Sequence, residues 1–157
     1  MKFCRFDLSS DFAATVHDRS RKNLLTAEEL RYQVRIGRFS KAALQALGLR
    51  DLDVVTSLSV LTKMVGKHGL GPDALAQLRD IVLNPVSVYK SDTFPGSVVV
   101  VSAMLPDGAN PLLMAIRVDK PDSAGKTNIH WMVSAYVKET PGILEKWEEK
   151  GLLLWRP

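Results

Sequence analysis

Two stretches of this sequence carry side chains that can exchange protons or bind an anion. One is Lys67-His68, which ends an apolar, helix-like segment. The other is the run from Asn128 to Lys138, NIHWMVSAYVK. Because strand side chains alternate between two faces, one face of this run is predicted to belong to the core: Ile129, Trp131, Val133, Ala135 and Val137. The other, mostly polar face then carries Asn128, His130, Met132, Ser134, Tyr136 and Lys138.

Arg117, in the apolar run before this strand, adds a cation to the set. A buried guanidinium without a partner is costly, so Arg117 is expected either to pair with an acid such as Asp119 or to be exposed and bind an anion. If the helix that ends at Lys67-His68 packs across the sheet, a histidine, an arginine, a hydroxyl group and lysines converge. We then expect one cleft to hold His68, Ser134, Tyr136 and Arg117.

Such a set of groups meets the requirements of a ribonuclease that works without a metal ion. This kind of enzyme needs a base that takes the proton from the 2′-hydroxyl, an acid that protonates the 5′-oxygen leaving group, and cations that balance the charge of the phosphorane. Histidine suits the proton transfers because its ordinary pKa is about 6.5. Each positioned acid or base contributes roughly 100- to 10,000-fold to the rate.

The same histidines and lysine also have structural interpretations. Lys67 and His68 complement the dipole of a helix that Gly69 is placed to end in the left-handed conformation. His130, beside an aromatic residue, is more readily explained as a strand-surface histidine than as a catalyst, since no partner for it can be named.

The remaining polar and aromatic residues of the run are equally open to two interpretations. Packing explains Ser134 about as well as function does, since it is small and lies in an apolar strand. Tyr136 and Trp131 either stack on nucleobases or belong to the core, where strand aromatics are more often found.

Standard catalytic and cofactor motifs are absent from the sequence. There is no Gly-rich phosphate loop, no H-E-x-x-H, no G-x-S-x-G and no cluster of acids on adjoining strand ends that would hold magnesium. Cys4 is the only cysteine, which excludes an internal disulfide and a thiolate zinc site. We therefore expect neither a metal ion nor an organic cofactor.

The patterns along the chain predict helices followed by a meander of strands. Helices are expected from Thr26 to about Val34, from Ser40 to Gly48, from Ser57 or Ser59 to Gly69, from Gly71 to Asn84, and after Pro141-Gly142 through Trp147. Strands are expected over 86–89, 98–101, 112–118 and 128–137, with a hairpin turn at 106–110. Shorter strands are indicated at 1–7, 52–55 and 152–155.

Composition indicates one compact domain. The 157 residues, with 46% apolar and 24% charged side chains, are typical of a globular chain. The net charge of +4 tilts the chain modestly towards anionic partners such as nucleic acid. No run reaches the ~18 apolar residues of a membrane span, and the start lacks the apolar core of a signal peptide. We expect synthesis in the cytoplasm and no membrane association. Secretion by a specialised system would leave no signal peptide in the sequence.

From about Ile36 to the C-terminus the chain resembles the C-terminal domain of phage MuF-type and polyvalent proteins. The resemblance rests on the order of short segments: IGRFSKAALQALGL, a helix ending in KH, LRDIVLNPVSVYKS, PGSVVVVSAMLPDG followed by a strand, NIHWMVSAYVKE and a terminal W…GLLLW. That domain is assigned to the barnase, EndoU, colicin and RelE-like (BECR) class of ribonucleases. The resemblance implies an α+β fold with N-terminal helices packed on a four-stranded antiparallel sheet and a C-terminal helix.

The resemblance also implies roles for individual residues. It favours His68 as acid or base with Lys67 beside it, and it selects Ser134 and Tyr136 in the strand motif. The catalytic set is thus His68, Lys67, Ser134, Tyr136 and Arg117, the last from strand geometry and not from the resemblance. The predicted substrate-binding residues are Asn128, His130, Lys90, Ser91 and Lys138.

The leading hypothesis is an RNA endonuclease over residues 36–157, of phage or mobile-element origin, acting as a toxin or effector. It would cleave by 2′-hydroxyl transesterification, in the cytoplasm of the producer or of a target cell. The predicted partners are RNA, with tRNA among the candidates, and an immunity protein. Residues 1–35 lie outside the resemblance and are predicted to be an arm or adaptor. The alternative is a non-catalytic, phage-associated module that binds nucleic acid or protein.

Overall fold

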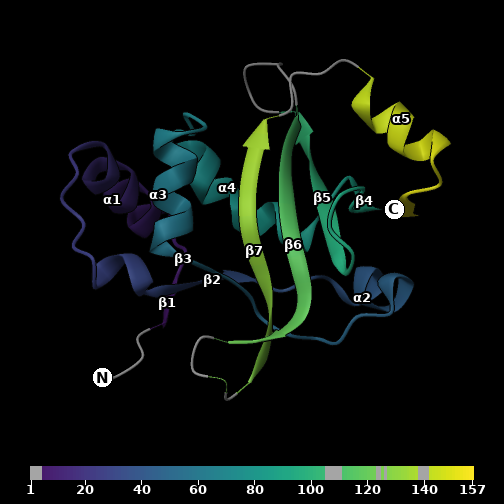
Figure 1. Ribbon diagram of the computed structural model, residues 1–157, viewed down its shortest axis with the longest axis horizontal. Coiled ribbons are helices and arrows are strands. Elements are labelled where there is room, and N and C mark those ends of the chain that lie inside the picture. Colours follow the sequence, from purple (N-terminus) through teal and green to yellow (C-terminus); the bar gives the residue numbers. More distant parts are fainter. Residues whose placement is uncertain (1–4, 105–110, 123–124, 126, 138–141) are drawn as a thin grey trace.

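One eight-stranded mixed sheet organises the chain (Figure 1). The computed structural model describes residues 5–104, 111–122, 125, 127–137 and 142–157. The strand order is β1-β2-β3-β7-β6-β5-β4-β8, in which β1 pairs with β2 and β3 with β7 in parallel, and the other neighbours are antiparallel. The strands are β1 Arg5–Asp7, β2 Gln33–Gly37, β3 Val54–Ser57, β4 Ser87–Lys90, β5 Ser97–Met104, β6 Pro111–Pro121, β7 Asn128–Val137 and β8 Leu153–Trp155.

The described α-helices are α1 Ser10–Arg21, α2 Lys41–Leu47, α3 Leu58–Gly66, α4 Pro72–Leu83 and α5 Ile143–Glu149. Serine side chains cap the starts of α1, α2 and α3. The hydroxyl of Ser57 accepts a hydrogen bond from the Val60 N–H at the start of α3, and Ser40 does the same for α2. Gly48 ends α2 with φ +67°, a conformation that favours glycine. The starts of α2 and α3 and the end of α2 agree with the sequence prediction, whereas no helix was predicted over α1 and α3 ends three residues before the predicted Gly69.

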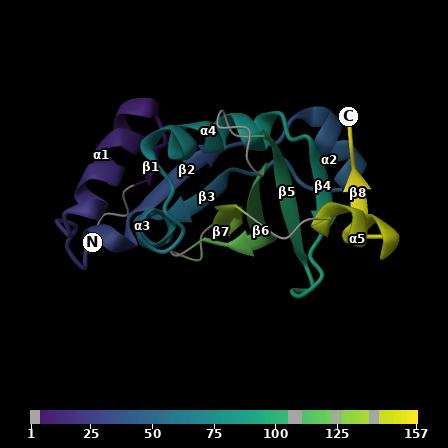
Figure 2. The same ribbon diagram turned by 90° about the horizontal axis from the view of Figure 1, so that it is seen from above.

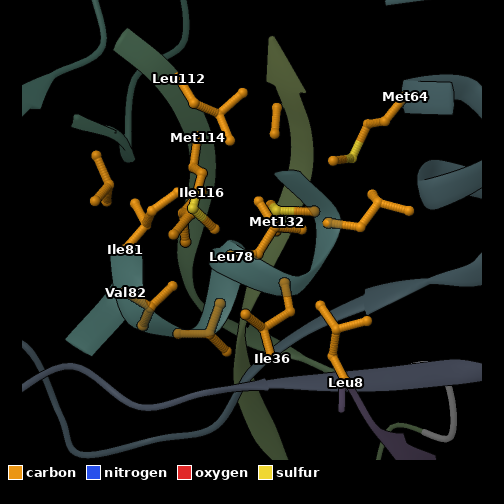
Figure 3. Packing of buried hydrophobic residues seen from close by; sticks show 14 of the residues in the cluster. Leu8, Ile36, Met64, Leu78, Ile81, Val82, Leu112, Met114, Ile116 and Met132 are labelled. Carbon is orange, nitrogen blue, oxygen red and sulfur yellow. The ribbon is translucent and has the colours of Figure 1, made fainter. Parts of the chain in front are cut away.

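Two cores lie on opposite faces of the sheet. Figure 2 shows α1, α4 and α2 along one side, which we call the inner face. In the larger core, residues of α4 pack against β6 and β7 (Figure 3), among them Leu78, Ile81, Val82, Leu112, Met114, Ile116 and Met132. A smaller core on the outer face holds Tyr89, Val99, Val101, Leu113 and Trp147 of α5. Each fully buried Leu or Met side chain contributes roughly 1.5–3 kcal/mol to stability.

The predicted four-stranded antiparallel sheet is wrong, because the described sheet has eight strands and two parallel pairs. The prediction counted the long apolar runs after residue 85 and assigned the first residues of β2 to the end of a helix. Thr26 and Glu29 do form the expected capping box, each accepting a hydrogen bond from the other's backbone N–H. The helix nevertheless stops after one 3-10 turn, Glu29–Arg31, since the following residues gain more by pairing between β1 and β3.

The predicted alternation along β7 is also wrong, because a β-bulge interrupts it. Ala115 pairs with Ser134 and Ile116 pairs with Met132, which leaves Val133 as an extra residue. A one-residue shift exchanges the two faces, so Met132 is buried in the inner core while Val133 is 39% exposed. The buried hydroxyl of Thr56 donates a hydrogen bond to the Met132 carbonyl oxygen, 2.8 Å away, beside the bulge. Tertiary hydrogen bonding therefore stabilises an irregularity that periodicity does not predict.

Residues before the predicted boundary at 35 contribute to the same sheet. β1 lies at one edge of it, as predicted, and its partner β2 spans the boundary. The division into an arm and a domain stays a prediction. The hairpin turn predicted at 106–110 lies outside the described residues. Within the part of the chain that the structure describes, no helix is long and apolar enough to cross a membrane.

Candidate functional site

Three rows of side chains cross the outer face of β5, β6 and β7. Strand register places Val101, Leu113 and Tyr136 in one row, and Val99, Ala115 and Ser134 in the next. The third row is Ser97, Arg117 and Trp131. Val99, Val101 and Leu113 belong to the outer core, so all three rows are on the outer face.

His68 reaches this face from the side of β7. β3 pairs with His130 and Trp131 near the start of β7, and α3, which follows β3 directly, lies beside β7 (Figure 1). The His68 ring lies 6.1 Å from the Tyr136 ring, measured between centroids, with the planes tilted by 41°. His68 and its neighbour Lys67 are exposed, and Tyr136 is half-buried. The end of α3 thus meets the sheet at Tyr136, one of the residues that the sequence interpretation grouped with His68.

Tyr136 keeps its phenolic proton more firmly than a free tyrosine. Burial raises its pKa, because the charged phenolate is disfavoured away from water. Ser134 is two residues earlier on the same strand and is half-buried on the same face. The two hydroxyl groups can donate hydrogen bonds to a bound anion next to the His68 imidazole.

Arg117 lies further along the same face and is exposed. Its guanidinium carbon is 5.9 Å from the centre of the Phe94 ring, and Arg117 forms no ion pair with a described residue. Asp119, the acid proposed from sequence as its partner, pairs instead with Arg50 at 3.1 Å. The structure therefore corresponds to the exposed alternative for Arg117.

His130 is fully buried and has a structural role, so the prediction that it lies on the strand surface is wrong. Its Nδ1 accepts a hydrogen bond from the Asp119 N–H at 3.0 Å. Because Nδ1 acts as acceptor, Nε2 carries the proton and donates a hydrogen bond to the Arg50 carbonyl oxygen at 2.9 Å. Burial lowers the pKa of His130, which favours the neutral imidazole in the folded protein. His130 satisfies backbone groups of a second irregularity, where Asp119 has φ +53°.

Asn128 belongs to the same structural cluster. Its amide nitrogen donates a hydrogen bond to the Asp119 carboxylate at 2.6 Å. This bond, together with Arg50, holds the pKa of Asp119 below its usual value. Asn128 and His130 therefore connect the start of β7 to β6 and the loop at Arg50, at a distance from the His68–Tyr136 contact.

Lys90 and Ser91, two other predicted substrate-binding residues, do not join His68. Lys90 pairs with Val98, an inner-core residue, and so alternates to the face opposite Tyr136. The Ser91 hydroxyl accepts hydrogen bonds from the N–H groups of Thr93 and Phe94, which organises the turn after β4. Lys138 lies outside the described residues.

Sequence reasoning missed Phe94, whose side chain is 59% exposed. The signal was present: Phe94 is an aromatic residue within a turn marked by Pro95-Gly96, where apolar side chains seldom find a core. Its pairing with Arg117 depends on the strand register and was not visible in the sequence.

Comparison with known families matches residues 59–156, more than half of the 157-residue chain, to the phage MuF C-terminal domain. No curated protein and no solved structure matches the chain. The matched segment contains all three outer-face rows and His68, whereas β1, β2 and β3 precede it. The resemblance to the phage MuF C-terminal domain that the sequence indicated is thus confirmed. The match gives no support for the BECR ribonuclease class. The chain belongs to the phage MuF C-terminal domain family.

Proposed function

We propose that this chain is an RNA endonuclease of the BECR class that cleaves by 2′-hydroxyl transesterification without a metal ion. The observation that carries the proposal is the contact between His68 and Tyr136 on the outer face, 6.1 Å between ring centroids. This contact places the His68 imidazole, a group able to transfer protons, beside β7, the strand that also presents the Ser134 hydroxyl. Expression as a phage or mobile-element toxin, with RNA as target and an immunity protein as inhibitor, is part of the same proposal.

The chemistry assigns one task to each group. The 2′-oxygen attacks phosphorus while the bond to the 5′-oxygen breaks, so one proton must leave the 2′-hydroxyl and one must reach the 5′-oxygen. His68 carries out one of these two transfers, as acid or base, and solvent water carries out the other. Tyr136 and Ser134 donate hydrogen bonds to the phosphate oxygens, because a tyrosine with a raised pKa is a better hydrogen-bond donor than proton shuttle near neutral pH. Lys67, the cation next to His68, balances the charge that develops on the phosphorane.

The direct test is incubation of the purified chain with tRNA and with total RNA in EDTA. We expect cleavage fragments that end in 2′,3′-cyclic phosphate, detected by mass spectrometry. His68→Ala should lower the rate roughly 100- to 10,000-fold, the usual contribution of a positioned acid or base. A substrate with a single 2′-deoxy nucleotide at the cleavage site should resist cleavage there, because the nucleophile is missing.

Two control variants separate chemistry from general surface effects. His17→Ala changes a histidine on α1, and Lys63→Ala changes an exposed lysine on α3, one turn before Lys67. Both should cleave at the wild-type rate. No cleavage by the wild type in any RNA, or equal cleavage by His68→Ala, would overturn the proposal.

A non-catalytic binding module is the second candidate. The observation in its favour is that His68 makes no hydrogen bond to a described residue, whereas a catalytic histidine is commonly oriented by one. Expression in bacteria distinguishes the two candidates, since a nuclease should inhibit growth in a manner that His68→Ala relieves. A binding module should leave growth equally affected by both proteins.

A further inference from the structure

Phe94 exposes 59% of its surface although it is a large apolar residue. Its ring is not free of contacts, because the Arg117 guanidinium carbon lies 5.9 Å from the ring centre. An exposed cation–aromatic pair of this kind contributes only about 0.5–1 kcal/mol by itself. Folding stability thus gives little reason for placing Phe94 on the surface.

The pair continues as a row across the sheet. Arg117 is the register partner of Trp131 on β7, so a second aromatic residue occupies the neighbouring position on the same face. The Trp131 indole N–H donates a hydrogen bond to the Pro121 carbonyl oxygen at 3.1 Å, which orients the half-buried ring. We call Phe94, Arg117 and Trp131 the aromatic row.

The turn that carries Phe94 is held in place by hydrogen bonds. The Ser91 hydroxyl accepts from the Phe94 N–H at 3.1 Å, and the Phe94 carbonyl oxygen accepts from the Ser97 N–H at 3.2 Å. The turn is therefore organised without a ligand, and binding to Phe94 need not order it first.

We infer that the aromatic row binds an unpaired nucleobase and its phosphate, so that the substrate of the proposed nuclease is single-stranded RNA. This inference rests on the function proposed above. Bases of a duplex are stacked within the helix, whereas an unpaired base can stack on an aromatic ring while a guanidinium binds its phosphate. Arg117 forms no ion pair with a described residue, and the chain carries a net charge of +4, so an anionic partner fits this face better than a neutral one.

The aromatic row is also placed to act together with the His68–Tyr136 contact. From Leu113, which pairs with Tyr136, to Arg117 is on the order of 13 Å along β6. The row between them carries Ala115 and Ser134, two small side chains. A single RNA strand bound on the aromatic row can therefore run along β6 and β7 towards His68.

Binding of RNA that cannot be cleaved tests the inference independently of catalysis. The probes are a fluorescent 2′-O-methyl 12-mer and the same 12-mer in a blunt duplex, titrated with the full chain and followed by anisotropy. Phe94→Ala should weaken single-strand binding roughly 5- to 150-fold, the usual loss of one stacked base, and should leave weak duplex binding unchanged. Arg117→Ala should lower the slope of log affinity against log salt by about 0.7, the value for one phosphate contact on a single strand.

A control variant and the cleavage assay show whether the inference, the nuclease proposal or both fail. Leu83→Ala removes another exposed apolar side chain, on α4, and should bind like the wild type. If the wild type cleaves RNA but Phe94→Ala binds single strands normally, or if duplex is bound as tightly as single strand, this inference fails and the nuclease proposal stands. If the wild type neither binds nor cleaves RNA, both fail. A wild-type oligomer that Phe94→Ala dissociates, seen by sedimentation, would assign the aromatic row to contact between copies and reject the inference.

Discussion

Replacing His130 with leucine should destabilise the protein, although the histidine lies in the strand that carries Tyr136. In the wild type the imidazole is fully buried and pairs with the Asp119 N–H and the Arg50 carbonyl oxygen. Leucine leaves the Asp119 N–H without this partner, whereas the Arg50 carbonyl oxygen still accepts a hydrogen bond from the Leu52 N–H. An unsatisfied buried polar group costs about 1–3 kcal/mol, so we expect a loss in this range from the Asp119 N–H alone.

The loss should depend on pH in a direction that the pKa determines. Burial lowers the folded-state pKa of His130 below the ordinary value of about 6.5, so below that pH the unfolded chain binds a proton more readily than the folded protein. The stability that His130 contributes is complete above about pH 6.5 and is lost as the pH falls through the folded pKa. The slope for one proton is at most about 1.4 kcal/mol per pH unit.

Urea denaturation at several pH values between 5 and 8, followed by tryptophan fluorescence, measures both effects. The difference in unfolding free energy between wild type and His130→Leu should be constant above about pH 6.5 and shrink below it. His68→Ala, which changes an exposed histidine, serves as the control and should follow the wild type. Equal stability of His130→Leu and wild type, or a difference that grows as the pH falls, would refute the structural role assigned to His130.

Three further predictions follow from single contacts. Tyr136→Phe should lower RNA cleavage roughly 100- to 1000-fold in a gel-based rate assay, since it removes one donor to the phosphate, while the denaturation midpoint stays near that of the wild type. Asp53→Asn should cost about 1–3 kcal/mol in urea denaturation, because the Asp53 carboxylate accepts hydrogen bonds from Arg35 and Arg38. Burial raises the pKa of Asp53, but these two arginines outweigh it and hold the pKa below its usual value. The cost should therefore be present above about pH 4 and disappear as the pH falls further, and a cost that persists in acid would contradict this. Thr56→Val should cost about 1–3 kcal/mol by leaving the Met132 carbonyl oxygen at the bulge without its donor, whereas an unchanged midpoint would show that the hydroxyl does not stabilise the bulge.

Local signals predicted the elements that depend on neighbouring residues. The helix starts at Ser40 and Ser57, the glycine after α2 and the unbroken valine strand from 98 to 101 were all recognisable, because caps and burial patterns act within a few residues. Thr26 and Glu29 show the limit of such signals: their capping box formed, yet the helix gave way to β2 within one turn.

Strand pairing between distant segments was not predictable in the same way. β3 pairs in parallel with β7 across more than 70 residues, and that pairing brings His130 beside Asp53. The bulge at Val133 depends on the partner strand as well, so a period of two assigned Met132 and Val133 to the wrong faces. Of the predicted site residues, His130 and Asn128 proved to be part of a partly buried hydrogen-bond cluster for this reason.

By itself the sequence determined the α+β composition of the chain, most helix boundaries and the two stretches that carry His68 and Tyr136. Tertiary structure decided that these two residues meet, that His130 is buried and neutral, and that Phe94 lies against Arg117. The division has a physical reason. Caps and turn residues act through nearby backbone groups, whereas register, bulges and burial depend on which distant strand supplies the hydrogen-bond partner.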